Sequence, residues 1–135
     1  MYLAYEAFPS DFEHDPAYLY ADSGLSVLYM YDGLTRLDLD QPQAALEAFN
    51  KVDGLQPKIS IGESTRLEFI NLQAKAAIAM RDRDASVIYI EAATKQAKVL
   101  DSQWGRSEAW EVYQQMKLVW PKDPTVKKMA ELFHR

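Results

Sequence analysis

The sequence contains no cysteine among its 135 residues. Disulfide bonds, thiolate nucleophiles and cysteine-ligated zinc or iron-sulfur sites are therefore excluded. Glycine and proline are also scarce, with 5 and 6 residues, and they lie between segments of regular apolar spacing. So few chain breaks predict a small number of long helices and no array of short strands.

Positive charge is in deficit, because 15 Lys and Arg residues face 20 Asp and Glu residues for a net charge of -5. A protein that binds phosphates needs a basic surface, so we expect no direct contact with nucleic acid. No apolar run approaches the roughly 20 residues of a membrane helix, and residues 1–10 lack the basic start of a secretory signal. These absences predict a cytoplasmic, soluble protein with no membrane partner.

What is present is an apolar content of 48%, spaced with the period of α-helices. We expect an all-α domain over residues 22–135, preceded by a helical or irregular lead-in over residues 1–21. The apolar spacing predicts six helices, at about residues 22–37, 40–53, 60–80, 85–100, 106–119 and 123–135. The fourth helix is expected to bury Ile88, Ala92 and Val99, which lie on one of its faces.

Polar residues and glycines mark the expected helix ends. Asp40, Asp84 and Asp123 are expected to cap the second helix of each of three hairpins, and they recur at similar intervals along the chain. Residues 60–63 have the pattern of a capping box, and Gly105 is expected to separate the fourth helix from the fifth. An interval of this size is typical of a helical repeat protein.

The first hairpin carries the most informative pattern, at Tyr29, Gly33, Ala45, Phe49 and Pro57. These intervals resemble the tetratricopeptide signature of an aromatic, a small residue, an Ala, an aromatic and a terminal Pro. The small residues allow two helices to approach closely, the second aromatic fills the gap to the next hairpin, and Pro ends the helix. The resemblance implies a tetratricopeptide-like α-solenoid of about three antiparallel helical hairpins. This chain departs from the signature at positions 32, 36 and 40, where Asp32, Arg36 and Asp40 replace Leu, an aromatic and Gly.

A second resemblance covers most of the chain. Residues 33–42, 66–71, 113–116 and 120–124 are similar to the C-terminal repeat region of bacterial transcriptional regulators of the Xre type. In those regulators an N-terminal helix-turn-helix reads DNA and the repeats sense a signal or mediate assembly. The resemblance implies a sensor or dimerisation region, and this sequence does not include a helix-turn-helix.

Asn71 is the most informative single polar residue, because it shares a face with apolar residues of the third helix. A buried amide needs hydrogen-bond partners, so Asn71 bonds either a neighbouring helix or an extended peptide. If the repeats curve as the resemblance implies, the first helix of each hairpin lines an inner groove. The residues expected to contact a partner there are Met30, Leu34, Asn71, Gln73 and Met80.

No residue pattern indicates catalysis, a metal or a cofactor. His14 lies in an acidic run that matches no metal motif, and His134 lies beside the C-terminus, where we expect it to be exposed. Two His residues so placed, in a chain without Cys, give no basis for a Ser-His or Cys-His nucleophile. We expect Trp104, Trp110 and Trp120 to pack in the core unless one of them marks a docking surface. The expected function is binding of a peptide or protein partner, and the alternative is self-association into a homodimer.

Overall fold

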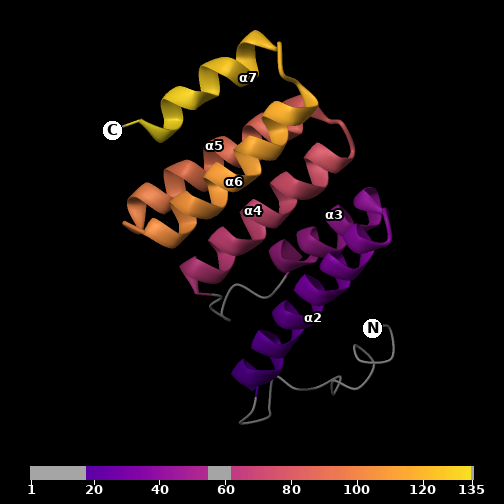
Figure 1. Cartoon of the computed structure of the whole chain (residues 1–135). Helices are drawn as coiled ribbons and strands as arrows, with labels where there is room; N and C mark the ends of the chain where they lie inside the picture. The colour runs from indigo at the N-terminus through magenta and orange to yellow at the C-terminus, as the bar shows by residue number, and fades with distance from the viewer. Residues whose placement is uncertain (1–17, 55–61, 135) are drawn as a thin grey trace. The chain divides into compact units, whose positions relative to one another are not determined.

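The computed structural model describes residues 18–54 and 62–134. Their regular secondary structure consists of helices joined by short turns and includes no strand (Figure 1). The chain divides into two compact units, residues 1–61 and residues 62–135. The all-α prediction is confirmed for the described residues, whereas most of the lead-in, His14 and Pro57 lie outside them. The helices of the first unit are α2 (Tyr18–Asp38), α3 (Pro42–Asn50) and the 3-10 segment η2 (Lys51–Gly54). Those of the second are α4 (Glu63–Ala79), α5 (Arg83–Val99), α6 (Gln103–Val119), α7 (Pro124–Lys128) and the 3-10 segment η3 (Met129–Phe133).

The first unit is a hairpin in which α2 packs against α3. Ala45, Phe49 and Val52 are buried, as their spacing predicts. A Cβ atom on Gly33 would collide with the ring of Phe49, so the helices approach this closely only because position 33 has no side chain. The half-buried Tyr29 lies one turn earlier on α2, with the Lys51 ammonium 5.9 Å from its ring centre.

Two departures from the tetratricopeptide signature compensate each other. The Nε atom of Arg36 donates a hydrogen bond to Oδ1 of Asp32 over 3.2 Å, one turn apart on α2. Asp32 is buried, and a buried carboxylate is tolerated when it is paired. A charged pair therefore occupies two positions where the signature has apolar side chains.

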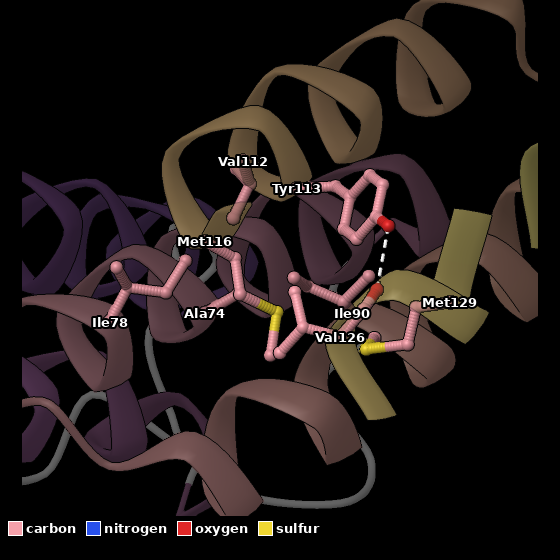
Figure 2. Close-up of a cluster of buried hydrophobic side chains, with 8 residues drawn as sticks. All are labelled: Ala74, Ile78, Ile90, Val112, Tyr113, Met116, Val126 and Met129. Atoms are coloured by element: carbon pink, nitrogen blue, oxygen red, sulfur yellow. Dashed lines mark hydrogen bonds between the residues drawn. The ribbon is translucent and has the colours of Figure 1, made fainter. Parts of the chain in front are cut away.

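The second unit is built from three long helices that pack against one another. The helix α5 packs against both α4 and α6, and α4 also contacts α6 (Figure 1). The apolar faces of all three, with α7 and η3, converge on one buried cluster (Figure 2). Its members are Ala74, Ile78, Ile90, Val112, Tyr113, Met116, Val126 and Met129.

The last helix changes type where the Tyr113 hydroxyl meets it. That hydroxyl donates a 2.6 Å hydrogen bond to the Val126 carbonyl (Figure 2). Burial raises the pKa of the Tyr113 phenol, and a hydrogen bond from the Ala130 backbone opposes that shift. The Val126 carbonyl also accepts from the Met129 amide. The α-helix ends at Lys128, and the chain continues as the 3-10 segment η3.

The caps of the second helices are more regular than the sequence predicts. Their N-cap residues are Gln41, Asp82 and Asp123, and the interval from the first to the second equals that from the second to the third. The predicted cap at Asp123 is confirmed, whereas the caps predicted at Asp40 and Asp84 are wrong. Asp40 has a left-handed backbone (φ 59°) just after α2, and Asp84 lies inside α5. The left-handed residue recurs at Arg81, before the second cap.

Of three other local predictions, two are wrong. The N-cap residue of α4 is Gly62, with no side-chain bond, whereas Ser60, the cap of the predicted capping box, lies outside the described residues. Gly105 lies within α6, where a Cβ would collide with Leu67, so it permits close packing and does not break the chain. The predicted face of α5 is its exposed face, because Ile88 and Val99 are 64% and 71% exposed. The buried face consists mainly of small side chains: Ser86, Ile90, Ala93, Thr94 and Ala97.

Candidate binding site of the second unit

The five predicted partner-binding residues are divided between the two units. Met30 and Leu34 are half-buried on α2 in the first unit. Asn71 and Gln73 are buried on α4, and Met80 is half-buried just after it. Their role in contacting a partner stays a prediction.

Asn71 does not form the structural hydrogen bond that the sequence left as an alternative. Both polar atoms of its side-chain amide are buried, and neither has a hydrogen-bond partner. On α6, which contacts α4, the Nε2 atom of Gln114 is also buried without a partner. The pKa of Glu68 on α4 is raised, first by burial and then by the charge of Glu108 on α6. Several polar groups of these two helices are thus poorly satisfied.

One cavity lies where α5, the start of α6 and η3 meet. We name it pocket A, and its volume is about 620 Å³, within the range of about 300 to 1,000 Å³ that is typical of small-ligand sites. Its lining combines charged and apolar residues. The lining residues are Thr94, Lys98, Asp101, Arg106, Leu132, Phe133 and His134.

A second cavity, pocket B, adjoins pocket A and has a volume of about 500 Å³. The two pockets share Arg106, Phe133 and His134. Pocket B adds Ser107, Trp110 and Glu111, all from α6. Together the pockets form a recess on both sides of Arg106 and Phe133.

Aromatic rings form the apolar part of this recess. Phe133 packs edge-on against Trp110 with ring centres 5.1 Å apart, and it stacks on Tyr113 at 5.2 Å. The Lys117 ammonium lies 5.6 Å from the Trp110 ring centre and 5.4 Å from that of Tyr113. Trp110 remains 43% exposed and Trp104 49%, so core packing is wrong for both, whereas the half-buried Trp120 packs against the core. An exposed tryptophan beside a recess is typical of a docking surface.

The charged part of the recess centres on Arg106. Its Nε atom is buried without a hydrogen-bond partner. Its Nη2 atom is 3.8 Å from Oδ1 of Asp101, which is beyond hydrogen-bond length, and the Asp101 side chain is 94% exposed. Solvent screening weakens so exposed a pair, so Asp101 neutralises Arg106 poorly. With Lys98 on α5, pocket A carries a local excess of positive charge in a chain of net charge -5.

The recess contains hydroxyl, imidazole and carboxylate groups, but they are not arranged as a catalytic array. Ser107, Glu111 and His134 all line pocket B, and among the described residues no hydrogen bond joins them. An activated nucleophile needs its base within hydrogen-bond reach. The described part of the chain also holds no group of three or more His, Asp or Glu residues that could bind a metal ion. The arrangement is suited to binding.

Sequence analysis missed both pockets. Arg106 and Trp110 are one turn apart on α6, and so are Thr94 and Lys98 on α5, but that spacing is common on any helix. His134 was predicted to be exposed, which is confirmed, yet its place beside Arg106 depends on how the last helix folds back. No local pattern in the sequence indicates that His134 and Arg106 lie in the same pocket.

Comparisons with protein-family models, with curated proteins and with solved structures found no match to this chain. Within residues 18–54 and 62–134, no helix has both the length and the apolar character needed to cross a bilayer.

Proposed function

We propose that this chain is a non-catalytic module that binds a peptide or protein segment. The observation that carries the proposal is the pair of adjoining pockets around Arg106 and Phe133, with the exposed ring of Trp110 at its side. Rigid aromatic rings beside an arginine are the side chains most often responsible for binding energy at interfaces.

We further propose that the fold is a tetratricopeptide-like α-solenoid of three hairpins. Three observations support it: the N-caps recur at equal intervals, left-handed residues precede two of them, and α4 contacts α6 across α5. Contact between first helices of successive hairpins is the packing that a row of hairpins requires. The resemblance to Xre-type regulators then suggests a sensor or dimerisation region that acts on attached DNA-binding domains.

Selection of peptides from a random library tests the binding function. The chain is immobilised, and enriched sequences are synthesised and titrated against it by calorimetry. We expect saturable binding that weakens at least tenfold in Trp110→Ala, while Trp104→Ala, a matched exposed tryptophan outside both pockets, binds as the parent does. Absence of any enriched, saturable peptide would reject the proposal.

Self-association is a second candidate, and the exposed apolar face of α5 favours it. Ile88, Ala92 and Val99 lie on one side of this helix and are exposed. A two-fold antiparallel pairing of α5 with a second copy would place each Ile88 opposite a Val99 and each Glu91 close to a Lys95. The face is therefore complementary to itself in both apolar contact and charge.

Sedimentation equilibrium over a wide concentration range tests this second candidate. We expect dimers that dissociate in Ile88→Lys, because the substitution places a charge in the apolar contact, whereas Lys122→Gln leaves the mass unchanged. A chain that stays monomeric at the highest concentration rejects self-association and leaves peptide binding untouched.

A further inference from the structure

The lining of pocket A combines cationic and apolar residues, and this combination specifies a ligand. The cationic residues are Lys98 and Arg106, and the apolar residues are Leu132 and Phe133. Thr94 lines the pocket from α5, and its hydroxyl already donates to the Glu91 carbonyl, so that oxygen can only accept a further bond. The charged donors for a ligand are therefore Lys98 and Arg106, and the imidazole of His134 lines the same pocket.

Arg106 holds its donors in a form that suits a carboxylate. The buried Nε–H has no partner, and the adjacent Nη2 has only the distant, exposed Asp101. A carboxylate can accept from the two terminal Nη groups of a guanidinium at the same time through two parallel hydrogen bonds. Nη2 has no described partner within hydrogen-bond length, so a ligand carboxylate would pair with it without displacing an internal hydrogen bond.

We propose that pocket A binds a carboxylate that carries a neighbouring apolar group, and this rests on the proposed binding function. The carboxylate pairs with the terminal Nη groups of Arg106, and Lys98 adds a second positive charge. The apolar group lies on Leu132 and Phe133. The same chemistry is offered by the end of a peptide chain and by a free acylated amino acid, and the experiment below separates these two sources.

Nuclear magnetic resonance titration with N-acetyl-leucine tests the proposal, because the side-chain resonances of Arg106 report on pocket A directly and the Trp110 indole reports on the adjoining pocket B. We expect saturable shifts of both resonances, and at least tenfold weaker binding of N-acetyl-leucinamide, which lacks the charge. Arg106→Gln should lose at least tenfold in affinity and Lys98→Gln a few-fold, while Lys122→Gln, the matched loss of one charge outside the pocket, binds as the parent does.

The peptide acetyl-Ala-Ala-Leu distinguishes the two sources. Tighter binding than N-acetyl-leucine assigns the pocket to a peptide end, and equal binding assigns it to a small carboxylate. Equal affinity for acid and amide, or unchanged binding in both Arg106→Gln and Lys98→Gln, overturns the proposal, and the second variant guards against misfolding of the first. Saturable shifts confined to residues outside pocket A overturn it while leaving the proposed function standing. Absence of shifts with all three probes overturns it as well, and the library selection decides the proposed function separately.

Discussion

Two helix pairs of the molecule, α2 with α3 and α6 with the α7–η3 segment, pack through a contact that is filled in opposite ways. In α2 and α3, Gly33 contributes no side chain and the ring of Phe49 fills the space. In α6 and the 3-10 segment η3, Tyr113 contributes the ring and Met129 packs beside it in the same cluster. The two members of each pair are separated by the same interval along the chain. The two pairs therefore share the same sequence interval. In the first pair the large ring comes from the second helix, whereas in the other pair it comes from the first.

The reversal has a structural consequence. A phenylalanine ring needs only packing, whereas a buried tyrosine hydroxyl needs a hydrogen-bond partner. Tyr113 finds it at the Val126 carbonyl, where the α-helix gives way to η3. The corresponding pair between α4 and α5 is Ala74 and Ile90, which includes neither a glycine nor an aromatic ring. The helix α5 remains a regular α-helix throughout.

The largest expected effect comes from removing the large partner in the first hairpin. Phe49→Ala should lower the free energy of unfolding by about 3 to 5 kcal/mol, because it leaves a cavity in a fully buried site. Urea unfolding followed by far-ultraviolet circular dichroism measures this. All three tryptophans lie in the second unit, so their fluorescence reports that unit separately. The exposed Glu47→Ala should change stability by less than about 0.5 kcal/mol. A comparable effect of the two substitutions would contradict the packing role of Phe49.

Adding volume on the other side of the same contact should have the next largest effect. Gly33→Leu should destabilise by about 1 to 3 kcal/mol, because its side chain must enter space that Phe49 occupies. The double variant Gly33→Leu with Phe49→Ala imitates the arrangement of the last hairpin. Its loss should be smaller than the sum of the two single losses in a double-mutant cycle by urea unfolding. Strict additivity would show that the two residues do not compete for one space.

Removing the hydroxyl from the last hairpin should have a smaller effect. Tyr113→Phe should cost about 1 kcal/mol or less, because the lost hydrogen bond is partly replaced when the Val126 carbonyl accepts from the Ala130 amide. Urea unfolding followed by tryptophan fluorescence measures the net loss of stability. Hydrogen exchange at the Ala130 amide measures whether this amide gains the replacement hydrogen bond. The exposed Tyr31→Phe serves as the control. A cost well above about 1 kcal/mol would mean that the α-helical bond is not recovered.

The smallest effect at neutral pH concerns the caps, which also differ between the two hairpins. The cap of α3 is the uncharged Gln41, whereas Asp123 caps α7. A hydrogen bond from Arg83 is the main cause that lowers the pKa of Asp123 below 3.8, and the amides of Val126 and Thr125 add to it. Because the folded-state pKa is the lower one, this carboxylate stabilises the fold above its unfolded pKa. That stability is lost as the pH falls through the depressed value.

Melting temperatures measured between about pH 6 and about pH 2 test this sign. The parent should lose stability in the acid part of this range more steeply than Asp123→Asn, which keeps a capping side chain but cannot titrate. Arg83→Gln should lie between them, because it removes the principal cause of the shift. Identical acid slopes for the parent and Asp123→Asn would reject the role of this group.

Sequence analysis was most accurate where the pattern alone carries the answer. Helix existence and most buried faces follow from apolar spacing, as at Ala109, Val112, Tyr113 and Met116, all of which are buried. It failed on α5 because the close contacts of that helix use Ser86, Ala93 and Ala97, whose small side chains contribute little to an apolar pattern. The larger Ile88 and Val99 then suggested the wrong face. Pockets A and B were not predictable, because their residues come from three elements that only packing brings together.

By itself the sequence determined that the described chain is helical, where Asp123 and Pro124 start the last helix, and that a small residue at position 33 lets two helices approach closely. Each of these depends on residues within about one repeat of one another, so backbone preference and apolar spacing suffice. The tertiary structure decided which face of α5 is exposed, that Asn71 lacks a hydrogen-bond partner, and that Arg106 lies beside Phe133. Those outcomes depend on the volume and polarity of side chains that meet across helices, and a linear pattern does not encode which side chains meet.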